Sequence, residues 1–265
     1  MNKVISKDGT QIAYETKGAG LAVILVDGAF CYRAFGPASQ LAELLAPRFR
    51  VYIYDRRGRG ESSNTKPFAV AREVEDIDAL IKEAGGSAFV FGTSSGACLA
   101  LEAAIALGDK ANKLALFEPP YNSDPTTLPA WEDYWKTLNE LIAADRRSDA
   151  VAWFMQFVST PAEQINGMRQ TPMWQTLEAV APTLPYDAAA MGEDRSVPVK
   201  RAATVRVPVL VLDGGANLEF MPFMHKTASE LARAIPDAQQ RTLEGQTHDV
   251  NLEVLAPVLA EFFRQ

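Results

Sequence analysis

The sequence has few cysteines and no long apolar run. Two cysteines in 265 residues do not make a disulfide framework, so we expect Cys31 and Cys98 to be reduced. The chain lacks the roughly 18 consecutive apolar residues that a membrane-spanning helix needs. Its first residues also lack the apolar stretch of a secretory signal. We therefore expect a cytoplasmic protein that does not bind membranes.

Positive charge is also scarce. The chain has 26 Lys and Arg against 33 Asp and Glu, a formal net charge of -7. This balance argues against a nucleic-acid partner, whose phosphates require a basic surface. We expect a small-molecule substrate, no cofactor, no metal, and a monomer or homodimer. With 48% hydrophobic and 22% charged residues, the composition is that of a globular chain.

Short apolar runs indicate a parallel β-sheet. The first 16 residues resemble a hairpin with Asp-Gly at its turn. The next runs are almost continuously apolar, which is typical of strands buried on both faces. Segments with helical periodicity separate them. These runs are "LAVILV" (21–26), "RVYIY" (50–54), "SAFVF" (87–91) and "KLALF" (113–117).

After the sixth expected strand the β signal stops. Residues 121–200 are helical in pattern and rich in Trp, Met and Phe, and then "VPVLVLDGG" (207–215) resumes the strand pattern. We predict an α/β fold with a doubly wound, mostly parallel sheet. Residues 1–120 and 201–265 would form the core domain. Residues 121–200 would be a helical cap over the carboxyl ends of the strands.

The segment "GTSSG" (92–96) stands between an expected buried strand and an expected helix. In that context G-x-S-x-G predicts a nucleophile elbow, a tight turn that exposes its middle serine. Ser94 would then be the nucleophile, beside backbone N–H groups at a helix N-terminus. Ser95 would contribute its N–H. The alternative is a glycine-rich loop without chemistry.

A serine nucleophile needs a base, and the chain has two histidines. His225 falls within an amphipathic helical segment, which favours a structural role. His248 lies in the polar loop "LEGQTHDV" between the last strand and the last helix, where it can reach Ser94. We therefore predict a Ser94 and His248 pair. Asp249 is expected to cap the following helix.

Five motifs together make the chain similar to the α/β-hydrolase superfamily over essentially its whole length. This resemblance implies a Ser, acid, His mechanism, but it does not select a substrate, because the superfamily hosts many reactions. The motifs, in order, are "VILVDGAF", "YDRRGRGESS", "GTSSG", "VPVLVLDGG" and "GQTHDV".

The acid departs from the superfamily pattern. Its usual place, a few residues beyond the strand of "VPVLVLDGG", is near Asn217, whose amide carries no charge. Some members place the acid after the preceding strand of the sheet, where this chain has Glu118 before two prolines. We favour Glu118 as the partner of His248. Asp213 is the alternative acid, and Glu219 is a weaker candidate.

A second departure lies after the first parallel strand, where the superfamily has His-Gly and this chain has Asp27-Gly28. The resemblance implies an oxyanion hole formed by the N–H groups of Ala29 and Ser95. An unpaired carboxylate there would be unfavourable. We therefore expect Asp27 to turn away and to be hydrogen-bonded or paired with Arg56 or Arg33. The arginines of "DRRGRG" should pair with nearby carboxylates.

Aromatic residues suggest a mainly apolar substrate of small to medium size. The leading prediction is a serine hydrolase of carboxylic esters or lactones. One alternative uses the same triad to cleave carbon–carbon or C–O bonds, and another is a binding protein with little turnover. The predicted substrate-binding residues are Phe30, Cys31, Trp131, Trp135, Phe154 and Trp174.

Overall fold

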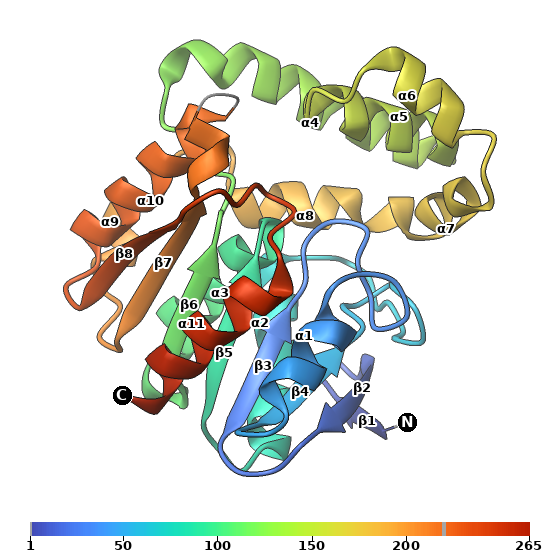
Figure 1. Ribbon diagram of the computed structural model, residues 1–265. Coiled ribbons are helices and arrows are strands. Elements are labelled where there is room, and N and C mark those ends of the chain that lie inside the picture. The colour runs from blue at the N-terminus through green and yellow to red at the C-terminus, as the bar shows by residue number, and fades with distance from the viewer. Residues whose placement is uncertain (1, 219–220) are drawn as a thin grey trace.

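Eight strands form one sheet in the computed structural model, which describes residues 2–218 and 221–265 (Figure 1). The spatial order is β1-β2-β4-β3-β5-β6-β7-β8. The β1/β2 and β2/β4 pairs are antiparallel, and the other neighbours are parallel. The strands are β1 (Asn2–Ile5), β2 (Gln11–Lys17), β3 (Ala22–Val26), β4 (Arg50–Tyr54), β5 (Ala88–Thr93), β6 (Ala111–Phe117), β7 (Val209–Gly214) and β8 (Ala238–Leu243).

The predicted doubly wound, mostly parallel sheet is confirmed. All five residues of β3 and all six of β7 are buried, as expected for strands covered on both faces. Observed and predicted ends differ by one or two residues at most of the strands. The six parallel strands β3 to β8 bring their carboxyl ends to one edge, where predicted site residues follow β3, β5, β6 and β8.

Helices cover both faces of the sheet (Figure 1). Two separate apolar clusters result, one beneath α1 and α11 and one beneath α2, α3 and α10. Asn251 caps α11 by accepting a hydrogen bond from the Glu253 N–H at 2.9 Å, so the prediction that Asp249 caps this helix is wrong. The helices are α1 (Ala38–Leu45), α2 (Val70–Glu83), α3 (Ser95–Leu107), α10 (Pro222–Ala234) and α11 (Leu252–Arg264).

Six further helices, which we call the helical layer, connect β6 to β7. Most of them lie beyond the carboxyl ends of the parallel strands (Figure 1). Aromatic rings pack inside this layer; those of Tyr134 and Phe157 stack with centroids 4.0 Å apart. The division into a core domain and a cap over residues 121–200 stays a prediction. The helices are α4 (Leu128–Ala143), α5 (Arg147–Phe157), α6 (Ala162–Met168), α7 (Pro172–Val180), α8 (Leu184–Met191) and α9 (Val199–Ala202).

No helix within residues 2–218 and 221–265 is long and apolar enough to cross a bilayer.

Candidate active site

Ser94 occupies the sharp turn between β5 and α3. Its φ of 55° and ψ of -132° are costly for a residue with a side chain. Two glycines permit this turn. A Cβ on Gly92 would lie 2.6 Å from the Cα of Ala97, and one on Gly96 would lie 2.2 Å from the Val26 carbonyl oxygen. The sequence therefore folds here into a strained strand-to-helix turn with Ser94 at its tip.

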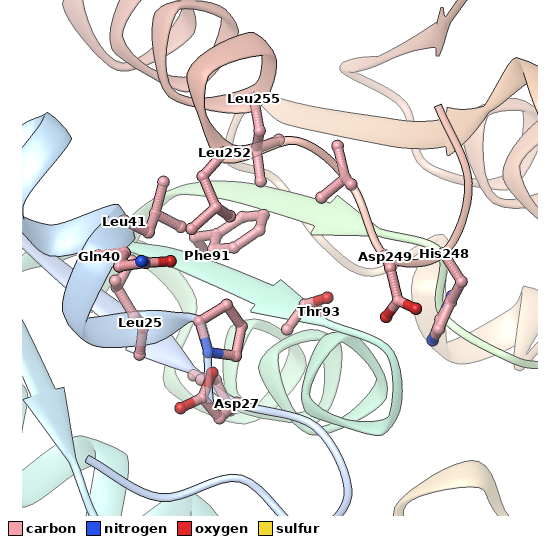
Figure 2. A pocket seen from close by; sticks show the side chains of 14 residues that line it. Leu25, Asp27, Gln40, Leu41, Phe91, Thr93, His248, Asp249, Leu252 and Leu255 are labelled. Atoms are coloured by element: carbon pink, nitrogen blue, oxygen red, sulfur yellow. The ribbon is translucent and has the colours of Figure 1, made fainter. Parts of the chain in front are cut away.

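His248 lies in the loop between β8 and α11, and its Nδ1 is 2.6 Å from Oε2 of Glu118. The backbone N–H of Ser94 donates to the Phe117 carbonyl at 2.9 Å, so Ser94 and Glu118 stand at the ends of adjacent strands. His248 and Thr93, the residue before Ser94, line one cavity (Figure 2). Among the described residues, Ser94 Oγ and His248 form no hydrogen bond with each other. Such bonds are often long before substrate binds.

Glu118 is fully buried and strained, with a φ of 46°. Its Oε1 accepts hydrogen bonds from the Gly214 N–H and from Asn217 Nδ2, both at 2.8 Å. Burial would raise the pKa of Glu118, but the hydrogen bonds from His248, Gly214 and Asn217 hold it below its ordinary value. Glu118 is therefore ionised at neutral pH. Asn217, which stands near the superfamily's usual acid position, here donates to Glu118.

The alternative acid, Asp213, contacts the other histidine. Its Oδ2 is 2.8 Å from Nδ1 of His225, and its oxygens also accept from Thr242 and Gln240. The chain thus contains two histidine–carboxylate pairs at neighbouring strand ends. Only the one with Glu118 involves the loop histidine that we predicted as the base. Glu219, the weaker candidate, lies outside the described residues.

The turn at residues 27–31 follows β3 and approaches Ser94 closely. A Cβ on Gly28 would lie 3.0 Å from the Cβ of Ser94, so a side chain at this position would crowd Ser94. Among the described residues, the Ala29 N–H has no hydrogen-bond partner. Ser95 is the first residue of α3, so its N–H has no partner within the helix. Both donors are available to a developing negative charge.

Among the described residues, the Asp27 side chain forms neither of the two predicted ion pairs, with Arg56 or with Arg33. Arg56 Nη1 donates to the Asp27 backbone carbonyl at 3.2 Å, while its other hydrogen bonds go to Glu73 and Asp187. Arg33 bonds to acids on other elements, including Asp55. The other prediction for "DRRGRG" is confirmed, because its three arginines form ion pairs with carboxylates.

The Asp27 side chain lines a cavity of about 260 Å³ together with His248 and Thr93 (Figure 2). Asp27 is 5% exposed. Burial raises its pKa to about 7, although the positive charges of Arg59 and Arg56 oppose the shift. A substantial fraction of Asp27 is therefore neutral near pH 7.

Asp27→Asn should reveal this shift as a pH-dependent change in stability. The folded protein holds the Asp27 proton more tightly than the unfolded chain between pH 3.8 and about 7. Ionisation of Asp27 therefore reduces the stability of the wild type as pH rises through this window. The free energy of unfolding of Asp27→Asn minus that of the wild type should increase by up to ~1.4 kcal/mol per pH unit there. Urea unfolding from pH 4 to 8 measures this difference, and a constant difference would contradict the shift.

The predicted substrate-binding residues lie in different surroundings. Phe30, at a φ of 64°, meets Phe154 of α5 edge to face with centroids 4.9 Å apart, which joins the 27–31 turn to the helical layer. Cys31 lies in the same turn, and burial raises the pKa of its thiol to about 12. The structure thus brings Phe30, Cys31 and Phe154 to one place.

The three predicted tryptophans pack within the helical layer. Trp131 is buried, its Nε1 donates to the Glu193 carbonyl, and Trp135 packs edge to face against it. Trp174 Nε1 donates to Ser148 at 2.8 Å. Their contacts with substrate stay predictions.

Within residues 2–218 and 221–265, no group of three or more His, Cys, Asp or Glu could hold a metal ion.

The sequence model of the alpha/beta hydrolase family matches residues 18–261, almost the whole chain. The chain belongs to the alpha/beta hydrolase family. The resemblance and the hydrolase class predicted from the motifs are thereby confirmed.

A solved alpha/beta hydrolase from Sphaerobacter thermophilus is 49% identical, with a TM-score of 0.88 over 99% of this chain and 100% of that chain. A thermophilic esterase from Thermogutta terrifontis is 23% identical, with a TM-score of 0.71 over 99% of this chain and 97% of that chain, and shows the same fold. A proline iminopeptidase from Pestalotiopsis fici is 30% identical over 128 residues, 44% of this chain and 43% of that protein. That match spans less than half of the relative's length.

Sequence reasoning missed Asp187 of α8. Its carboxylate is 3% exposed and accepts a hydrogen bond from Ser95 Oγ at 2.8 Å. The signal was an aspartate inside the otherwise apolar segment "LPYDAAAM" (184–191). A lone acid of this kind indicates a buried partner, but the sequence does not say which one.

Proposed function

We propose that this hydrolase uses Ser94 as nucleophile, His248 as general base and Glu118 as the acid that orients it. The N–H groups of Ala29 and Ser95 would form the oxyanion hole. The observation that carries the proposal is the 2.6 Å contact between His248 Nδ1 and the buried Glu118 carboxylate, in the loop beside the Ser94 turn. This contact fixes Nδ1 as the protonated nitrogen and leaves Nε2 to accept a proton.

The first half of the reaction transfers the acyl group to the enzyme. Ser94 Oγ forms a bond to the acyl carbon while His248 Nε2 takes its proton. The carbonyl electrons move to oxygen, where the Ala29 and Ser95 N–H groups stabilise the charge. When the tetrahedral intermediate collapses, the bond to the leaving oxygen breaks. His248 returns the proton to that oxygen, leaving an ester on Ser94.

The second half repeats these steps with water. His248 removes a proton from water as the water oxygen attacks the acyl carbon, and the oxyanion hole again holds the charge. Collapse breaks the bond to Ser94 Oγ, which recovers its proton from His248. The products are a carboxylic acid and an alcohol, or a hydroxy acid when the substrate is a lactone.

We propose a small to medium, mainly apolar ester or lactone as substrate. Support comes from the contact of Phe30 with Phe154, which presents aromatic surface where the helical layer meets the 27–31 turn. Residues 121–200 would act as a cap that surrounds the acyl or alcohol group. The Thermogutta terrifontis protein with the same fold is an esterase, which agrees with this bond class.

A panel of p-nitrophenyl esters from acetate to octanoate, together with γ- and δ-lactones, tests the proposal. We expect turnover of at least one class, and a mass increase equal to the acyl group on the intact protein during turnover. His248→Ala should lose turnover, while His225→Ala, the other paired histidine, should keep it.

Two outcomes would contradict the ester or lactone proposal. Labelling of Ser94 by a fluorophosphonate without turnover of any ester or lactone would favour cleavage of carbon–carbon or C–O bonds. Tight binding of panel compounds without turnover or labelling would favour a binding protein.

A further inference from the structure

A single buried carboxylate of the helical layer lies against the turn that carries Ser94. Asp187 Oδ1 accepts hydrogen bonds from Ser95 Oγ at 2.8 Å and from Arg56 Nη1 at 2.6 Å. Its Oδ2 accepts from Arg59 Nη2 at 2.7 Å. The side chains of both arginines are at most 1% exposed. Asp187 therefore joins α8 to two loops of the core at once.

Arg59 extends this network to the 27–31 turn. Its Nη1 donates to the carbonyl oxygens of Gly28 at 2.6 Å and Cys31 at 3.1 Å. The peptide between Gly28 and Ala29 is not among the cis bonds, so its C=O and N–H point in opposite directions. A guanidinium that holds the Gly28 oxygen thus aims the Ala29 N–H the other way. It also polarises the amide and strengthens that N–H as a donor.

Asp187 also holds Ser95 in place. The Ser95 hydroxyl donates a hydrogen bond to Asp187 Oδ1, which fixes the first residue of α3. The peptide N–H of Ser95 is the other donor of the proposed oxyanion hole. One carboxylate therefore holds both donor-bearing segments, although these lie on different loops.

The charges of the network are balanced. Arg56 and Arg59 face Glu73 and Asp187, so the two cations and two anions cancel. Burial would raise the pKa of Asp187, but Arg59, Arg56 and Ser95 hold it below its ordinary value. Asp187 stays charged, and the ion pairs of Arg56 and Arg59 are formed with Glu73 and Asp187, not with Asp27.

We infer that Asp187 is a positioning residue for the oxyanion hole. It holds the Ser95 segment directly and the Ala29 peptide through Arg59, and it couples both to the helical layer. This inference rests on the proposed function.

Asp187→Asn tests the inference because it keeps the side-chain shape and removes the charge. We expect kcat on a p-nitrophenyl ester to fall by about 10- to 100-fold, since a displaced donor costs less than a deleted one. KM should change by less than about threefold, because the loss is confined to the transition state. Circular dichroism and thermal unfolding check that the variant is folded.

A thionoester substrate provides a readout that reduced stability alone would not move. Sulfur is a weaker hydrogen-bond acceptor than oxygen, so a well-aligned hole favours the oxygen ester. The ratio of kcat/KM for the ester to that for its thionoester should fall by about tenfold in Asp187→Asn, as the oxygen-specific stabilisation is lost. The inference would be overturned if Asp187→Asn had the kcat and the ester to thionoester ratio of the wild type. It would also be overturned if Asp187→Asn lost kcat while this ratio stayed unchanged.

Ser95→Ala offers a milder variant should Asp187→Asn not fold. It deletes one hydroxyl and should lower kcat by about 3- to 10-fold, with the ester to thionoester ratio falling in parallel. Where both variants fold, the double variant should be no slower than Asp187→Asn alone, because the two changes break the same tie. Fully additive losses would overturn the inference.

Asp76→Asn is the matched control. Asp76 is a buried aspartate paired with Arg57 of the same "DRRGRG" segment, but Arg57 donates to the carbonyl of Arg72, not to the 27–31 turn. We expect the ester to thionoester ratio of Asp76→Asn to match that of the wild type. A Ser94-dependent wild-type activity combined with an unaffected Asp187→Asn would refute this inference alone. Loss of Ser94 dependence would refute the proposed function.

Discussion

Ser94→Ala should lower kcat by about 10⁴- to 10⁶-fold, the largest effect that we expect from any single substitution. The change deletes the oxygen that forms the acyl-enzyme. It should leave the fold intact, because Ser94 anchors its turn through its backbone N–H and C=O, which bond to Phe117 and Ala97. Alanine carries a Cβ as serine does, so the substitution should leave the backbone strain at a φ of 55° nearly unchanged.

Fluorophosphonate labelling with intact-protein mass spectrometry measures the same prediction without a known substrate. Wild-type protein should gain one adduct, and Ser94→Ala should gain none. Ser95→Ala is the adjacent control. It should still be labelled, because its backbone N–H remains, but more slowly because its tie to Asp187 is lost.

The outcome that contradicts the assignment is specific. Labelling of Ser94→Ala at the wild-type rate would show that another residue reacts. Labelling lost in Ser95→Ala and kept in Ser94→Ala would exchange the roles of the two serines.

The fold was largely predictable because the signals that specify it are local. Continuous apolar runs marked β3 to β6, since strands buried on both faces must be apolar along their whole length. Residues 121–200 were predicted only as helical, and the bounds of α6 (Ala162–Met168) and α8 (Leu184–Met191) within them were not predicted. Each spans about two turns, which is too short for a helical period to be clear.

The candidate site was predictable where a motif is contiguous. The turn at residues 92–96 requires glycines at fixed spacing, and His248 was one of two histidines. The surroundings of Asp27 and the partners of Asp187 were not predictable, because they depend on contacts across the fold. Asp187 lies 92 positions from Ser95 in sequence. The sequence offered Arg56 and Arg33 alike as partners for Asp27, but Glu73 and Asp187 bind the guanidinium of Arg56.

Glu118→Gln should lower kcat by about 10³- to 10⁴-fold. A glutamine amide has no negative charge to stabilise the protonated His248 that forms in the transition state. Its NH₂ group would also face donors, because Glu118 now accepts from Asn217, Gly214 and His248. The imidazole would then rotate or adopt the wrong tautomer. KM should change much less than kcat, since Glu118 is buried behind His248 and does not reach the substrate.

Asp213→Asn is the matched control for this prediction. Asp213 is equally buried, ends the neighbouring strand and binds Nδ1 of a histidine at 2.8 Å. That histidine is His225, whose side chain is 42% exposed and which has no role in the proposed reaction. We expect kcat of Asp213→Asn to stay within about threefold of the wild type, because this change should affect stability more than chemistry. A large loss of kcat in Asp213→Asn with little loss in Glu118→Gln would reverse the assignment of the acid, since it would mean that His248 turns to Asp213 during turnover.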